Sequence, residues 1–294
     1  MPTGKRLMLT SRDIETFKLL GRYRYLRSTY LHAFAGGLSA TRFKERLGHL
    51  YHEGGYIERP AQQWLFAEAR YQPAVYESAE GAVRALQSAG IAADDKRTFL
   101  GDAPHRQFLH SLMICEALAS IELGARDNPH LRFIGWQEIL ARAPEATRLS
   151  PTPFRIAVPT GGYVVPDGLF GLEYTRAGAK AYRFFALEVD RGTMPVARSK
   201  PGQTSVLSKL AAYREILTRQ THKTHWGVSR LLVLMLVPNE ERMSNIVEHL
   251  AKGTEGNENF LFKALTSSGT ALPVPQLLSE PYRRAGSTSL FIDV

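Results

Sequence analysis

Three segments between residues 163 and 213 decide the fold, and they are YVVPDG at 163–168, YRFFALEVD at 182–190 and SVLSKLAAY at 205–213. The first is a short apolar run that ends in Pro166 and Asp167. The second is a strand-like run that ends in two carboxylates. Side chains alternate along a strand, so Glu188 and Asp190 are predicted to share one face while their neighbours enter the core.

The third segment is predicted to be a helix that brings a cation and a hydroxyl to the same place. Lys209 and Tyr213 are four residues apart, which puts them on one side of such a helix. Carboxylates at strand ends suit a hard cation, so Asp167, Glu188 and Asp190 are predicted ligands of magnesium or manganese. Together these five side chains are the predicted catalytic group.

The same motifs resemble a known family. PD followed further along by E-x-D on an apolar strand resembles the core of the PD-(D/E)xK nuclease superfamily. More narrowly, PDG, LEVDRGT and K-L-x-x-Y resemble the replication-relaxation family of plasmid and mobile-element proteins, from about Thr10 to about Phe262. The resemblance implies a winged helix joined to a restriction-endonuclease-like domain, with magnesium-dependent endodeoxyribonuclease chemistry as one activity.

The resemblance also bears on two further acidic residues. In nucleases of this superfamily the helix before the PD strand often brings an acidic residue to the metal, which implies that Glu116 lies at the edge of the site. A solvated glutamate is the alternative. Asp190 stands where the superfamily has its lysine and carries no positive charge at pH 7. Lys209 is therefore expected to supply the cation that contacts the phosphate.

Composition is that of a globular protein with a basic surface. The 294 residues are 44% hydrophobic and 22% charged, with a formal net charge of +9 and a sequence pI of about 9.7. One cysteine excludes an internal disulfide and fits a cytoplasmic location. No run reaches the length of a membrane span, and no membrane partner is expected. A basic balance favours nucleic acid.

The charge is concentrated near the N-terminus. Residues 1–59 hold 11 Lys or Arg against 5 Asp or Glu, a net charge of +6. Capping residues and apolar spacing predict helices that begin at Thr10 or Ser11, at Ser28 or Thr29 and at Ala40. A wing of two strands, at 56–59 and 70–76, and a helix at 79–88 follow. Three helices and a hairpin predict a winged helix-turn-helix.

The third helix, Ala40 to about Glu53, is the predicted DNA-reading helix. Its outer side carries the candidate DNA-binding residues Thr41, Arg42, Lys44 and Arg46, which a solvated helix face would also explain. A basic loop after Asp190 is expected to cross the active face and to add Arg191 and Lys200.

After a linker at 91–104, strands alternating with helices predict a mixed sheet with helices on both faces. The expected fold class is therefore α/β, or α+β overall. Residues 1–90 form the winged helix and residues 105–294 the nuclease-like domain. The nuclease-like domain is expected to begin with a helix from His105 to about Leu123. It is also expected to contain a buried strand at 228–237 and to end in an irregular tail at 272–294.

Two functions remain open at this point. One is a DNA-binding protein of plasmid or mobile-element replication, relaxation or transfer with a magnesium-dependent nicking or cleaving site. The other is a non-catalytic replication or transcription regulator, in which Arg191 and Lys209 neutralise the carboxylates. Expected partners are double-stranded DNA, a second copy of the chain in a homodimer, and proteins of plasmid replication or transfer.

Overall fold

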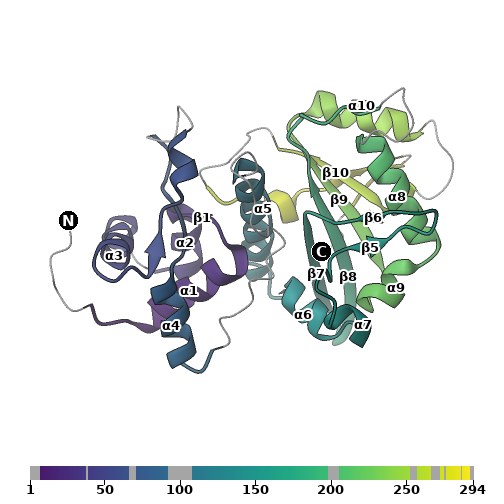
Figure 1. Ribbon diagram of the computed structural model, residues 1–294. Coiled ribbons are helices and arrows are strands. Elements are labelled where there is room, and N and C mark those ends of the chain that lie inside the picture. The colour runs from purple at the N-terminus through teal and green to yellow at the C-terminus, as the bar shows by residue number, and fades with distance from the viewer. Residues whose placement is uncertain are drawn as a thin grey trace. The chain divides into compact units, whose positions relative to one another are not determined.

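The structure is a computed structural model that describes residues 7–37, 39–65, 71–91, 108–197, 205–251, 257–265, 272–274, 276–285 and 287–291. The chain divides into two compact units. The N-terminal unit comprises Met1–Leu123 with Gly269–Val274, and the C-terminal unit comprises Gly124–Ser268 with Pro275–Val294. Figure 1 labels their elements along the chain.

The N-terminal unit is built from helices around a small sheet. Its elements are α1 (Ser11–Tyr23), β1 (Leu26–Arg27), α2 (Ser28–Ala35), α3 (Ala40–His52), β2 (Ile57–Glu58), the 3-10 helix η1 (Ala61–Leu65), β3 (Val75–Ser78), α4 (Glu80–Ser88) and α5 (Phe108–Arg126). The three strands form an antiparallel sheet in the order β1-β3-β2. The predicted helices are therefore present, while the second strand of the pair, expected at 70–76, is found at Val75–Ser78, and residue 70 lies outside the described residues.

Local sequence signals account for the starts of these helices. Thr10 caps α1, and its hydroxyl accepts a hydrogen bond from the backbone N–H of Asp13 while the Asp13 carboxylate returns one to Thr10. Ser39 caps α3 in the same way, through the backbone N–H of Arg42. The apolar stripe Phe43, Leu47 and Leu50 is buried, as the periodicity predicts.

Helix α5 corrects two expectations. Its described part runs from Phe108 to Arg126, and the predicted start at His105 lies outside the described residues. Residues up to Leu123 belong to the N-terminal unit, whereas the sequence placed this helix in the nuclease-like domain. It is also long and apolar enough to cross a membrane by length and composition, which the sequence reading missed. Among the helices that the structure describes it alone is that long and apolar, and most of it is buried inside the protein.

The C-terminal unit is organised on one seven-stranded sheet in the order β12-β11-β10-β9-β8-β7-β4. Its strands are β4 (Leu131–Ile134), β7 (Gly168–Arg176), β8 (Ala179–Val189), β9 (Leu231–Val237), β10 (Phe260–Ala264), β11 (Tyr282–Arg284) and β12 (Ser287–Phe291). The central trio β8-β9-β10 is parallel, and the flanking pairs are antiparallel. The predicted mixed sheet is confirmed.

Helices and a small hairpin surround this sheet. They are α6 (Trp136–Ala141), α7 (Glu145–Arg148), β5 (Ile156–Ala157), β6 (Tyr163–Val164), α8 (Val206–Thr218), α9 (Thr221–Trp226), α10 (Glu240–Ala251), the 3-10 helix η4 (Asn257–Asn259) and α11 (Gln276–Ser279). Helix α10 packs on β9, β10 and α8, so α8 and α10 lie side by side beside the sheet (Figure 1). Every residue of β9 is buried, which explains its unbroken apolar sequence.

Two segments differ from expectation. The run at 163–166 contributes only β6, which pairs with β5 outside the main sheet, so Asp167 precedes β7 instead of ending a strand. The tail is not irregular, because β11 and β12 extend the sheet edge. Their short length left little periodicity to detect.

Candidate functional site

The register between β7 and β8 brings Asp167 and Glu188 together. The strands are antiparallel, and Gly168 lies opposite Leu187, so the residue before β7 lies beside the end of β8. The Asp167 carboxylate accepts a hydrogen bond of 2.9 Å from the backbone N–H of Val189. Asp167 and Glu188 are therefore neighbours, although Asp167 lies just before the start of β7 and Glu188 lies near the end of β8.

Helix α8 supplies a lysine and a tyrosine to Glu188. Ser205 caps the helix through a reciprocal hydrogen-bond pair with Ser208, which fixes where its first turn begins. The Lys209 ammonium forms an ion pair with Oε2 of Glu188, and the Tyr213 hydroxyl donates to Oε1 at 2.5 Å. Thus four of the five predicted catalytic side chains converge, and we call Asp167, Glu188, Lys209 and Tyr213 the acid–lysine cluster.

Burial sets the electrostatics of this cluster. Glu188 is only 3% exposed and Tyr213 is fully buried. Burial, and then repulsion from Asp167, raise the pKa of Glu188 to about 8 against the opposing effect of Lys209. Burial lowers the pKa of Lys209, but the two carboxylates outweigh it and raise that pKa overall. One ammonium thus faces two carboxylates, so the cluster is an attractive place for further positive charge.

Asp190 does not join this cluster as the predicted third ligand. Its backbone N–H continues the ladder by donating to Leu236, but its carboxylate pairs with Arg242 of α10 and accepts from the backbone N–H of Gly192. The Arg242 guanidinium also donates to the carbonyl of Met194. Among the described residues no group of three or more His, Cys, Asp or Glu side chains could hold a metal. Asp190 instead fixes the loop after β8.

Glu116 is paired in the N-terminal unit. Nη1 of Arg27 contacts its two carboxylate oxygens at 2.6 and 2.7 Å, and both side chains are less than a tenth exposed. Burial raises the pKa of Glu116 to about 8 despite this arginine. Glu116 thus takes part in a buried ion pair, and its place at the edge of the metal site stays a prediction. Local sequence contains no signal for a partner 89 residues away.

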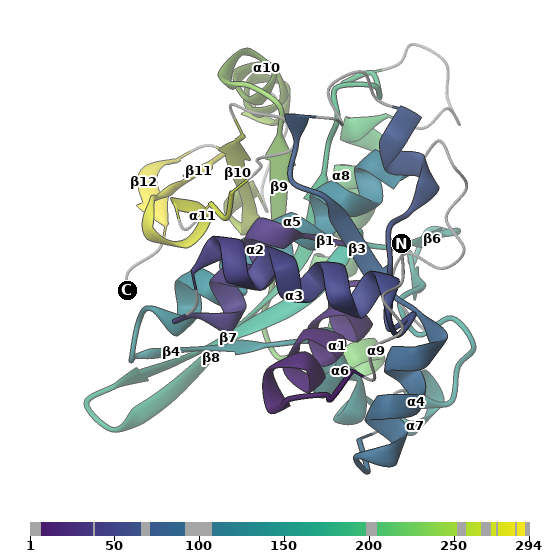
Figure 2. The same cartoon turned by 90° about the vertical axis from the view of Figure 1, so that its left-hand side faces the viewer.

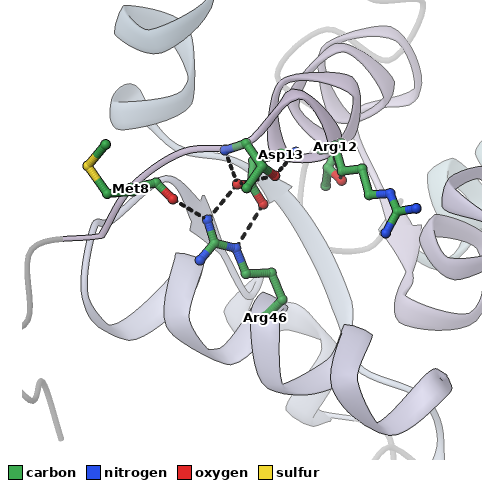
Figure 3. Close-up of polar contacts among 6 residues, drawn as sticks. Met8, Arg12, Asp13 and Arg46 are labelled. Atoms are coloured by element: carbon green, nitrogen blue, oxygen red, sulfur yellow. Dashed lines mark hydrogen bonds and ion pairs between the residues drawn. The ribbon is translucent and has the colours of Figure 1, made fainter. Parts of the chain in front are cut away.

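The predicted DNA-binding residues fall into three groups. Thr41, Arg42 and Lys44 are exposed on α3, and Arg191 is exposed after β8. Lys200 lies outside the described residues. Arg46 is engaged within the protein, because its guanidinium contacts both carboxylate oxygens of Asp13 at 3.0 and 2.6 Å and the carbonyl of Met8 at 2.6 Å (Figure 3).

Replacing Arg46 with methionine should therefore lower stability by about 1–3 kcal/mol at pH 7, because the buried Asp13 carboxylate loses its charged donor. Burial raises the pKa of Asp13, but hydrogen bonds from Arg46 and Thr10 lower it below its ordinary value of 3.8. A carboxyl whose pKa is lowered by folding stabilises the fold at pH values above its pKa in the unfolded chain. This stabilisation is lost as the pH falls through the pKa of the folded state. Urea denaturation should show the difference at pH 7, and the difference should shrink progressively as the pH falls below about 3.8. Arg42→Met, exposed on the same helix, should change little.

The fold and the cluster define a class of protein, a two-unit α+β chain whose mixed sheet carries a buried acid–lysine cluster. The model of the replication-relaxation family matches residues 17–232, most of the length, and the chain belongs to that family. Membership indicates a role in the replication or relaxation of plasmids or mobile elements. Comparisons with curated proteins and with solved structures returned no match.

Proposed function

We propose that this chain binds double-stranded DNA during replication or transfer of a plasmid or mobile element, and that its C-terminal unit cleaves a phosphodiester bond with magnesium. The observation that carries the proposal is the convergence of Asp167, just before β7, with Glu188 on β8 and Lys209 on α8. Two carboxylates and a lysine at one point are the groups that phosphodiester hydrolysis requires.

The donor set fits one magnesium ion. Magnesium takes oxygen ligands, is commonly bound through one or two carboxylates and keeps several waters. Asp167 and Glu188 supply two such carboxylates, and they repel each other in the absence of a cation. When bound, magnesium would neutralise charge on the phosphate and lower the pKa of a coordinated water.

The remaining side chains would hold the metal ligands in position and neutralise charge on the phosphate. Lys209 is about a quarter exposed, so its ammonium can turn from Glu188 to a phosphate oxygen. Tyr213 is fully buried, which leaves it to hold the Glu188 carboxylate in place. Asp190 and Arg242 would hold the adjoining loop.

A second candidate is a regulator that binds DNA without cleaving it. It is favoured by the full occupancy of Glu188, whose two oxygens already accept from Lys209 and Tyr213, and by the pairing of Asp190 with Arg242. In that case the acid–lysine cluster is a structural ion-pair network.

The proposed DNA contact lies on α3 of the N-terminal unit. We propose that this unit is a winged helix, because a turn with two positive-φ glycines, Gly36 and Gly37, lies between α2 and α3, and an antiparallel pair of strands follows α3. Helix α3 buries one stripe and exposes Thr41, Arg42 and Lys44 near its N-terminal end. The N-terminal residues of a recognition helix are those that reach base edges in the major groove.

Replacing Arg42 and Lys44 together with alanine should weaken duplex binding and reduce its salt dependence. Each lost phosphate contact removes about 0.9 from the slope of log K against log salt, so the slope should fall by about 1.8. Fluorescence anisotropy with a labelled duplex measures both quantities. Arg84→Ala on α4, an exposed arginine paired with the exposed Glu80, is the control. An unchanged slope in the double variant would place the contact elsewhere.

A further inference from the structure

The β7–β8 hairpin extends beyond the strands beside it. Pairing of β9 with β8 begins at Phe184, and pairing of β4 with β7 ends at Tyr174, followed by one hydrogen bond from Thr175 to the carbonyl of His130. Residues 175–183, here called the β-arm, are left as a two-stranded ribbon that Figure 2 shows projecting past β4. Ala177 and Gly178 close it with two positive φ angles, a tight turn that matches the strand twist.

The β-arm is basic and slim. Its sequence, TRAGAKAYR, has three cations and no acidic residue. Lys180 pairs with the adjacent Glu173, which Arg132 also contacts, and its side chain is still 58% exposed. Arg176 is exposed at the tip, and the Arg183 guanidinium lies 5.0 Å from the Tyr174 ring centre. Charged residues often protect an exposed sheet edge from pairing with another chain, but that role does not require a ribbon that extends beyond the sheet. Four of the nine residues of the β-arm are alanine or glycine, so it is also narrow.

These features point to one kind of partner. A two-stranded ribbon fits the major groove of duplex DNA, which is about 12 Å wide. Small side chains keep the β-arm thin, and its cations match the phosphates on either side of the groove. Tyr182, 40% exposed on the same ribbon, adds a hydroxyl that can donate to phosphate.

We infer that the β-arm is a second DNA contact, one that enters a groove of the duplex and places Arg176 and Lys180 on phosphates. The inference rests on the proposed DNA-binding function and adds to it a contact made by the C-terminal unit itself. The β-arm lies at the start of β8 and the acid–lysine cluster at its end, so the contact would hold the duplex at the opposite end of the β7–β8 hairpin from the cluster.

The test is duplex binding by the full chain carrying Arg176→Ala and Lys180→Ala. The slope of log K against log salt should fall by about 1.8, with an affinity loss of about tenfold or more near 0.1 M salt. The matched control is Arg148→Ala with Arg219→Ala, which removes the same charge from exposed positions on α7 and after α8. The control should stay within about twofold of wild type.

A gain-of-contact variant keeps the test decisive if the double variant folds poorly. Ala179 is exposed next to the turn, and Ala179→Lys adds a cation to the β-arm, so the slope should steepen by about 0.9. Equal losses in the β-arm and control variants would indicate diffuse charge and overturn the inference. So would an equal loss on a duplex RNA, because the deep, narrow major groove of A-form RNA excludes a ribbon.

The outcomes separate this inference from the proposed function. If the wild-type chain shows no salt-dependent duplex binding, both fail. If Arg42→Ala with Lys44→Ala weakens binding while the β-arm variants match wild type, only the β-arm contact fails.

Discussion

Replacing Arg27 with methionine should lower the free energy of unfolding by about 3–5 kcal/mol, the range observed when one partner of a buried ion pair is removed. Glu116 would remain in an apolar setting with its side chain only 4% exposed. Burial already raises the pKa of this carboxyl to about 8 with the arginine present, so its charged form would be poorly stabilised without it. Urea denaturation followed by circular dichroism would measure the loss.

The double variant Arg27→Met with Glu116→Leu is the matched control. It removes both charges and fills the space with apolar groups, so most of the lost stability should return. A double variant as unstable as the single one would show that the ion pair is not the source of the loss. A single variant that costs less than about 1 kcal/mol would show that α5 is not held to the N-terminal unit through this pair.

Replacing Asp167 with asparagine should remove metal-dependent cleavage without unfolding the protein. Asparagine keeps an oxygen that can accept from the backbone N–H of Val189, while the loss of charge relieves repulsion on Glu188. The melting temperature without metal should therefore stay equal or rise. A metal ligand is worth several kcal/mol in the transition state, so the rate should fall on the order of a thousandfold.

Magnesium itself offers a second readout of the same substitution. A ligand that binds only the folded state raises its apparent stability by mass action, so magnesium should raise the melting temperature of wild type and not of Asp167→Asn. A variant that melts well below wild type while wild type shows no metal response would assign Asp167 to a structural network.

Much of the fold was predictable because local patterns specify it. Ser39 before an apolar stripe of Phe43, Leu47 and Leu50 predicts α3 within a residue or two, since capping and periodicity act over one or two turns. The unbroken apolar run of β9 predicts a strand covered on both faces. The convergence of Asp167 with Glu188 was also predictable, through the resemblance that the motif carries.

Three of the predicted site residues have ion-pair partners that the sequence did not indicate, because tertiary structure decides which partner each one meets. Glu116 pairs with Arg27, and Asp190 pairs with Arg242 fifty-two residues further on. Arg46 lies on the predicted DNA-reading helix, yet its guanidinium forms an ion pair with Asp13. Each carboxylate has a plausible local role, and nothing in its neighbouring residues indicates the arginine that it meets.

The most direct measurement of the central claim is cleavage of supercoiled plasmid DNA by the purified full chain. With magnesium or manganese, wild type should convert the plasmid to nicked or linear forms, and chelation by EDTA should stop the conversion. Lys209→Met should slow it strongly, and Asp167→Asn should show none while retaining wild-type duplex binding. Absence of cleavage by wild type with either metal, under conditions where the duplex is bound, would contradict the nuclease centre and leave a DNA-binding regulator whose acid–lysine cluster is structural.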